Sequence, residues 1–219
     1  MATLYTVHPD NPQPRTIERI REALHKGAVM LYPTDTVYAI GCDLNSKSAI
    51  ERVRQIKQQS NDKPLTFLCP SLSDIARYAI VGDSAYRIMK RLIPGPYTFI
   101  LPMTKLVPKL VLNPKRKTTG IRVPDHAICQ ALLATLGNPI ISTSANLMED
   151  GTSRTKNKAL PSRFELFDAL EKVVDVIVDS GEELGTQVST ILDLTGEEPI
   201  MVRRGLGWEE VEEWALEVS

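Results

Sequence analysis

The spacing of apolar residues along the chain alternates between a helical period and short runs typical of strands. Ile17, Ile20 and Leu24 predict a helix over 16–26, which Gly27 is suited to end. The same reasoning predicts further helices over 46–57, 74–78, 84–92, 125–136 (with Asp125 as its N-cap), 165–173 and 209–218. It predicts strands over 28–32, 65–69, 97–101, 119–123, 139–142, 174–179, 190–194 and 200–203. This alternation favours an α/β fold in which helices flank a twisted sheet.

The chain has 219 residues, a length that supports one substantial core and leaves little room for two. We therefore predict a single domain over 1–219. Residues 147–161 show no apolar period, so we expect a long mobile loop there, of the kind that often forms a lid.

Composition is ordinary for a soluble globular protein, with 42% hydrophobic and 24% charged residues and a net charge of −1. Bulk charge thus predicts neither a nucleic-acid nor a membrane partner, although a local basic cleft would escape this argument. No apolar run approaches the roughly 18 to 20 residues of a membrane helix, and the first residues lack a signal-peptide pattern. The three cysteines are widely spaced, and we interpret them as buried thiols of a cytoplasmic protein. The three histidines lack metal-ligand spacing, so we predict no metal held by the protein itself.

Polar clusters adjoin four of the predicted strands. They are Thr34-Asp35-Thr36, Lys63, Arg122 and the stretch 142–146 (STSAN). In open α/β sheets ligands bind where polar loops converge at the ends of strands, and this set of hydroxyls and amides suits phosphate or carboxylate oxygens. The alternative for each cluster is an ordinary turn with Ser, Thr and Asn as caps.

Three basic residues have a similar double interpretation. Lys57 ends a predicted helix, and Arg203 and Arg204 follow the apolar residues 200–202 of a predicted strand. Each could compensate a helix dipole or supply charge to a polyphosphate. The chain has no Walker A sequence, no G-x-S-x-G elbow and no dinucleotide fingerprint, which excludes those classes of site. The residues alone predict an α/β protein with an anion-binding cleft.

Seven stretches, in order, resemble motifs of the YrdC/TsaC family of threonylcarbamoyl-adenylate synthases. They are YPTDTVYAIGCD, KPLTFLC, PGPYTFIL, TTGIRVPDH, PIISTSAN, VSTILDL and IMVRRG. Together they span nearly the whole chain, and within the family the chain is most similar to the YciO branch. The resemblance implies a twisted, mostly mixed sheet flanked by helices, with a deep concave basic cleft.

The implied reaction joins L-threonine, bicarbonate and ATP into threonylcarbamoyl-AMP and pyrophosphate. Mg²⁺ would arrive with the ATP. The product would then pass to the tRNA t6A transferase machinery. Catalysis would consist mainly of positioning and of charge neutralisation at the α-phosphate.

The resemblance also implies roles for individual residues. Lys57, Ser144 and Asn146 would be catalytic, and ATP would contact these three together with Ser142 and Arg203. Thr34, Thr36, Arg122, Ser189 and Thr190 would bind threonine, with Arg122 facing its carboxylate.

The chain departs from the family pattern at three positions. Gln59 stands where the family has an arginine, Ser60 replaces the proline that follows it, and Leu68 stands where a histidine is usual. A neutral donor in place of a guanidinium could cost on the order of tenfold in transition-state stabilisation. Two alternatives therefore stay open. One is a paralogue that binds tRNA or double-stranded RNA in the same cleft without synthase activity, and the other is a paralogue acting on a different carbamoyl or adenylate ligand.

Overall fold

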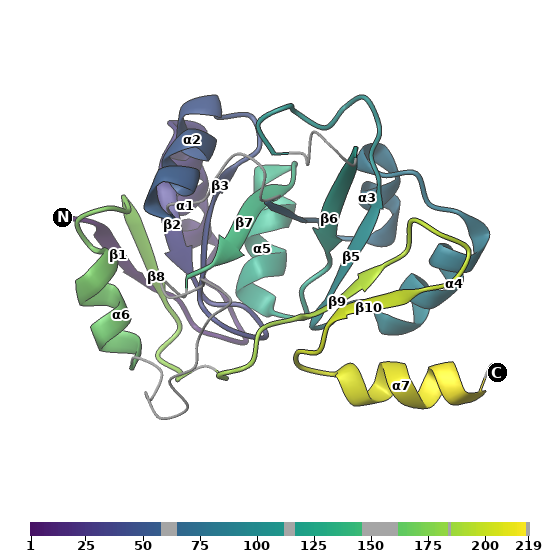
Figure 1. The fold of residues 1–219 in the computed structure, drawn as a ribbon. Helices are drawn as coiled ribbons and strands as arrows, with labels where there is room; N and C mark the ends of the chain where they lie inside the picture. The colour runs from purple at the N-terminus through teal and green to yellow at the C-terminus, as the bar shows by residue number, and fades with distance from the viewer. Residues whose placement is uncertain (58–64, 112–116, 146–161, 184, 218–219) are drawn as a thin grey trace.

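A single mixed sheet of ten strands, flanked by helices, organises the chain in the computed structural model (Figure 1). The structure describes residues 1–57, 65–111, 117–145, 162–183 and 185–217. The strand order is β1-β8-β2-β3-β7-β4-β6-β5-β9-β10. Neighbours in the sheet come from distant parts of the sequence, so residues far apart in the chain meet on its surface.

The strands are β1 (Thr3–Thr6), β2 (Val29–Tyr32), β3 (Ala39–Asp43), β4 (Thr66–Leu68), β5 (Tyr97–Pro102), β6 (Thr118–Arg122), β7 (Ile140–Ser144), β8 (Val176–Asp179), β9 (Thr190–Asp193) and β10 (Ile200–Arg203). The helices are α1 (Pro14–His25), α2 (Lys47–Ile56), α3 (Leu72–Tyr78), α4 (Asp83–Leu92), α5 (Ala127–Leu136), α6 (Arg163–Leu170) and α7 (Trp208–Glu217).

The predicted α/β fold is confirmed, and every predicted helix and strand is present, with the ends of most of them shifted. Two strands, β1 and β3, were not predicted. The N-cap prediction for α5 was wrong, because the cap position belongs to His126 and Asp125 lies one residue outside it. Gly137 does end this helix in the left-handed region, at φ 72°. The predicted loop over 147–161 lies outside the described residues.

Helices cover the two faces of the sheet unequally. Because side chains alternate across a strand, odd-numbered residues of β2 point to one face and even-numbered ones to the other. The odd face, with Leu31, packs in one apolar cluster with α2, α3, α4, α6 and α7. The even face, with Met30 and Tyr32, packs in a second cluster with α1 and α5.

On this second face, the central and later strands carry small polar residues instead of large apolar ones. Ser142 on β7 aligns with Thr66 on β4, and Thr66 aligns with Gly120 on β6. The cluster around α1 and α5 includes no residue of β5, β6, β9 or β10. The sheet therefore leaves a polar stretch over its middle strands, and the pocket described below forms there.

Candidate functional site

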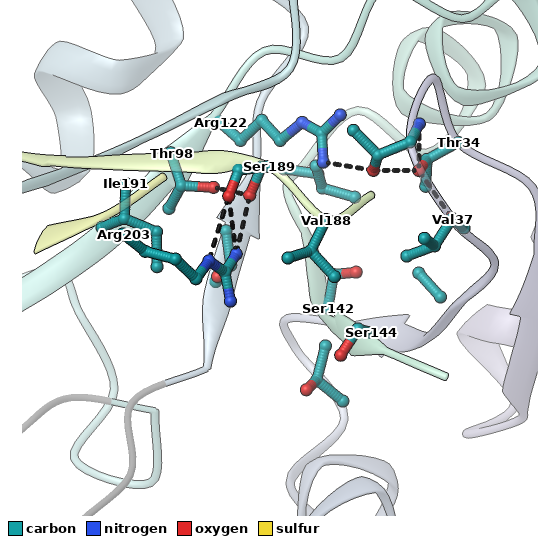
Figure 2. Close-up of a pocket in the computed structure, with 15 residues that line it drawn as sticks. Thr34, Val37, Thr98, Arg122, Ser142, Ser144, Val188, Ser189, Ile191 and Arg203 are labelled. Carbon is teal, nitrogen blue, oxygen red and sulfur yellow. Dashed lines mark hydrogen bonds between the residues drawn. The ribbon is translucent and has the colours of Figure 1, made fainter. Parts of the chain in front are cut away.

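A pocket of about 270 Å³ lies on the polar stretch of the sheet (Figure 2). Eight of its lining residues carry hydroxyl groups, two are arginines, and the rest are apolar. Its lining consists of Thr34, Thr36, Val37, Ala39, Thr66, Leu68, Thr98, Arg122, Ser142, Thr143, Ser144, Val188, Ser189, Ile191 and Arg203. Among the described residues no carboxylate belongs to this lining, so the pocket favours a ligand with anionic or neutral polar oxygens.

The register of the strands explains why these residues meet. Leu68 on β4 aligns with Arg122 on β6, and Thr98 on β5 aligns with Ile191 on β9. Because successive side chains of a strand point to opposite faces, Ser142 and Ser144 on β7 lie on the same face of the sheet. The segment 34–37 connects β2 to β3 and closes one side of the pocket.

Arg122 is a buried charge whose partner comes from the turn after β2. Its Nη2 donates to Asp35 Oδ1 at 2.5 Å, its Nη1 to Thr36 Oγ1 at 3.0 Å and its Nε to Gly95 O at 3.3 Å. The side chains of Arg122 and Asp35 are 8% and 10% exposed. A guanidinium has five N–H donors, so these bonds hold its plane firmly and leave donors for a ligand.

The two threonines of the turn form a hydrogen-bond chain with a defined direction. Thr34 Oγ1 donates its single proton to Val37 O at 2.7 Å. The contact of 3.0 Å between Thr34 and Thr36 hydroxyls must then use the Thr36 proton, while Thr36 accepts from Arg122. Both hydroxyl protons are thus committed to the protein. Thr34 Oγ1 also accepts from Thr36 N at 3.2 Å, which fills its second lone pair, so of these two oxygens only that of Thr36 retains an acceptor position for a ligand.

Arg203 and Ser189 form the opposite corner of the pocket (Figure 2). Arg203 donates from Nε and Nη2 to Ser189 O at 3.0 and 2.9 Å, and from Nη2 to Ser189 Oγ at 3.1 Å. Ser189 Oγ also lies 2.9 Å from Thr98 Oγ1. These contacts join β10 to β5 through Ser189 and place a guanidinium at the pocket wall.

A glycine makes the close approach of β10 to this corner possible. A Cβ on Gly205 would lie 2.2 Å from Val188 O, a distance no side chain tolerates. The backbone N of Gly205 donates to Thr190 Oγ1, and Thr190 Oγ1 donates to Leu206 O. Thr190 therefore fastens the chain beneath the corner and is not part of the pocket lining.

The structure brings most of the predicted site residues together. Those that line the pocket are Thr34, Thr36, Arg122, Ser142, Ser144, Ser189 and Arg203. Lys57 is the half-buried C-cap residue of α2 and, like Thr190, lies outside the lining. Asn146, Gln59 and Lys63 lie outside the described residues. The deep, strongly basic cleft stays a prediction.

Sequence reasoning missed Thr66 and Thr98. Each sits inside a strand where a β-branched residue is expected in any case, so neither stood out as polar. The available signal was period two, because Thr66 and Leu68 share one face of β4 while Phe67 faces the core on the other. Choosing the pocket face, however, requires the strand order of the sheet.

Other reactive side chains of the described residues are buried or isolated. Burial raises the pKa of Cys42 and Cys69 to about 12 and raises that of Cys129 further. Burial also lowers the pKa of His126, which stands at the start of α5. Within the described ranges, no group of three or more His, Cys, Asp or Glu side chains is arranged to hold a metal ion. No described helix is both long enough and apolar enough to cross a bilayer.

Comparison with known proteins places the chain in a family. The model of the Sua5, YciO and YrdC proteins, described as "Telomere recombination", matches residues 22–205. The uncharacterized protein YciO of Escherichia coli (strain K12) is 45% identical over 207 residues, covering 94% of this chain and 97% of YciO. The threonylcarbamoyl-AMP synthase of Vibrio vulnificus (strain YJ016) is 32% identical over 179 residues, covering 80% and 84%.

Solved structures agree with this placement. The crystal structure of E. coli YciO superimposes with a TM-score of 0.84 at 43% identity, covering 94% of this chain and 97% of that one. The P. abyssi Sua5 structure complexed with L-threonine gives a TM-score of 0.84 at 26% identity, covering 97% and 60%. The mixed sheet flanked by helices is thus the fold of these proteins, and this chain belongs to the Sua5/YciO/YrdC family.

Proposed function

We propose that this protein is a threonylcarbamoyl-AMP synthase, forming threonylcarbamoyl-AMP and pyrophosphate from L-threonine, bicarbonate and Mg²⁺-ATP. The observation that carries the proposal is the pocket lining, in which the described residues bring hydroxyls and two guanidiniums together and include no carboxylate. A relative at 32% identity is named as this synthase, and a second family member is described in complex with L-threonine.

The pocket offers distinct chemistry to the two substrates. Arg122 retains N–H donors for a carboxylate, and the Thr36 oxygen can accept one bond from an ammonium, N–H or hydroxyl group. This combination suits an amino acid. On the other side, Ser142, Ser144 and Arg203 suit the oxygens of the α-phosphate.

The proposed reaction has two steps. Threonine carbamate would form from the amino group and bicarbonate with loss of water. A carbamate oxygen would then attack the α-phosphate, where a P–O bond forms as the bond to pyrophosphate breaks. The chain's contribution is to orient the two substrates and to compensate the charge that develops on the phosphate oxygens. Mg²⁺ bound to ATP would neutralise the leaving pyrophosphate.

The proposal is tested by incubating the protein with threonine, bicarbonate and Mg²⁺-ATP and measuring threonylcarbamoyl-AMP and pyrophosphate. Arg122→Ala should abolish the threonine-dependent signal and leave ATP binding nearly intact, because Arg122 lies on the threonine side. Equal loss of both ligands would show that the two sides are assigned wrongly. If the folded wild type binds neither ATP nor threonine, the proposal fails. Binding of RNA at physiological salt would then favour the RNA-binding alternative.

A further inference from the structure

The phenol of Tyr32 makes a buried hydrogen bond to Ser142, a residue that lines the pocket. Tyr32 is fully buried on β2, two strands away from β7 in the sheet. Its Oη lies 2.6 Å from Ser142 Oγ, and Ser142 is itself 5% exposed and lines the pocket. Tyr32 is outside the pocket lining, so any influence on a ligand passes through Ser142.

Gly41 on the intervening strand β3 makes this contact possible. Gly41 aligns with Ser142 on β7 and with Met30 on β2. A Cβ at Gly41 would lie 2.9 Å from Tyr32 Cε1 and equally near to Ile140 and to a backbone oxygen of Ile141. The ring of Tyr32 thus passes over the space left by the missing side chain, and its hydroxyl reaches Ser142.

The direction of the hydrogen bond follows from counting protons. Each hydroxyl has one proton, and among the described residues each of these two oxygens has the other as its bonding partner. If Ser142 donated, the phenol proton of Tyr32 would be buried without an acceptor, which is strongly disfavoured. If Tyr32 donates, the proton that remains belongs to Ser142, which reaches the pocket. The second arrangement satisfies both groups once a ligand oxygen is present.

We propose that Tyr32 is a positioning residue that donates to Ser142 and thereby fixes the Ser142 hydroxyl as a hydrogen-bond donor toward an anionic oxygen of the bound nucleotide. This inference rests on the proposed function, because it assigns the Ser142 side of the pocket to a phosphate. A hydroxyl that accepts one bond becomes a better donor in the next, so the phenol strengthens the bond to the ligand as well as orienting it.

The proposal gives the pocket two sides of opposite polarity. Thr34 and Thr36 donate their hydroxyl protons within the protein, and Thr36 keeps one lone pair with which it can accept a bond from the ligand. Ser142 faces the ligand as a donor. An anionic oxygen is therefore favoured at Ser142, and an N–H or O–H group is favoured at Thr36. The hydroxyl groups at the two ends of the pocket thus differ in the direction of the hydrogen bond that they offer.

The test measures the affinities of Mg²⁺-ATP and of L-threonine by calorimetry for wild type, Tyr32→Phe, Ser142→Ala and the double variant. Phenylalanine keeps the ring over Gly41 and removes only the donor. We expect Tyr32→Phe to weaken ATP binding by about three- to tenfold and Ser142→Ala by roughly tenfold, with threonine affinity changed less than about twofold. In the double variant, Tyr32→Phe should add nothing to Ser142→Ala.

Tyr78→Phe is the matched control, because Tyr78 is a buried tyrosine of α3 in the cluster on the opposite face of the sheet. It should leave both affinities unchanged. Unchanged ATP affinity in Tyr32→Phe, equal weakening of ATP and threonine, or independent effects in the double variant would overturn the inference while leaving the proposed function standing. If Tyr32→Phe does not fold, Ser142→Ala alone decides, and retained ATP affinity there overturns it. No ATP binding by folded wild type overturns both.

Discussion

The Asp35–Arg122 pair yields a prediction in which stability and ligand affinity change in opposite directions. Asp35→Asn removes the counter-charge of a guanidinium that is 8% exposed and keeps a side chain of nearly the same size. The Asn oxygen can still accept from Arg122 Nη2, but the amide nitrogen replaces Oδ2, which accepts from Asp125 N at 3.2 Å in the wild type. Arg122 also retains Gly95 O and Thr36 Oγ1 as acceptors.

The cost to stability can be bounded. Removing one partner of a buried ion pair costs about 3 to 5 kcal/mol when the other charge is left uncompensated. The retained hydrogen bonds place this case at the lower end, so we expect the free energy of unfolding to fall by about 3 kcal/mol, measured by urea denaturation.

Affinity for an anion should rise in the same variant. Arg122 lines the pocket, and with Asp35 neutralised its charge acts on the ligand undiminished. At an effective dielectric constant near 20, one unit charge about 8 Å away is worth roughly 2 kcal/mol before screening by salt, which corresponds to binding tighter on the order of tenfold or more. Calorimetric titration with L-threonine measures this gain, which should shrink as salt is added.

Asp179→Asn supplies the matched control. Asp179 pairs with Arg163 at 2.8 Å, their side chains are 15% and 12% exposed, and neither lines the pocket. Stability should fall there too, with threonine affinity unchanged. If Asp35→Asn binds threonine more weakly than wild type, Asp35 contacts the ligand or shapes the turn, and the electrostatic reasoning is wrong.

Four further predictions concern the backbone, titration, thiols and catalysis. Gly205→Ala should lower the free energy of unfolding, measured by urea denaturation, by about 3 kcal/mol or more, because the new Cβ would lie 2.2 Å from a backbone oxygen. Gly120→Ala is the control, because the nearest atoms to its Cβ lie at 3.6 Å, and it should change the free energy of unfolding by less than about 1 kcal/mol. Burial lowers the pKa of His126 in the folded protein, so on acidification the histidine is protonated at a higher pH in the unfolded chain than in the folded one. The free energy of unfolding should therefore fall as the pH drops through 6.5, and His126→Gln should reduce this dependence of stability on pH. The three buried cysteines should resist a thiol reagent at pH 8 in the native protein and react fully in denaturant. Gln59→Arg, with Ser60→Pro if needed, should raise threonine-dependent pyrophosphate release roughly tenfold, and no gain in either variant while ATP still binds would mean that the site serves another reaction.

Much of the fold could be predicted because its signals are local. Strands such as β2 and β7 are apolar runs bounded by turn residues, and helix α1 shows a clear apolar period. Strand β3 escaped prediction because all five of its residues are buried, so it lacks the alternation of a half-buried strand and contains Gly41. Strand β1 is a short, exposed edge strand with little pattern to detect.

The pocket was predictable as a list of residues but not as an arrangement. Clusters of Thr and Ser after strands marked Thr34, Thr36 and Ser142 as site residues. The partners of these residues come from elsewhere in the chain, and partners depend on strand order. Nothing near Arg122 in the sequence indicates that Asp35 neutralises it across 87 positions, or that Tyr32 lies behind Ser142.

The structure and the departures from the family pattern bear on different parts of the proposed reaction. Within the described residues, the hydroxyls and guanidiniums that would recognise the substrates converge on one pocket, whereas Lys57 lies outside its lining. In the family pattern, the position of Gln59 carries an arginine that would add positive charge beside Lys57. Leu68 on β4 is an apolar residue that aligns with Arg122 on β6. Under the proposed function, binding would depend mainly on the first set, and stabilisation of the transition state would depend mainly on the second. A protein of this design should therefore bind threonine and ATP with ordinary affinity while turning them over slowly, so that its deficit relative to a full synthase lies in kcat and not in KM.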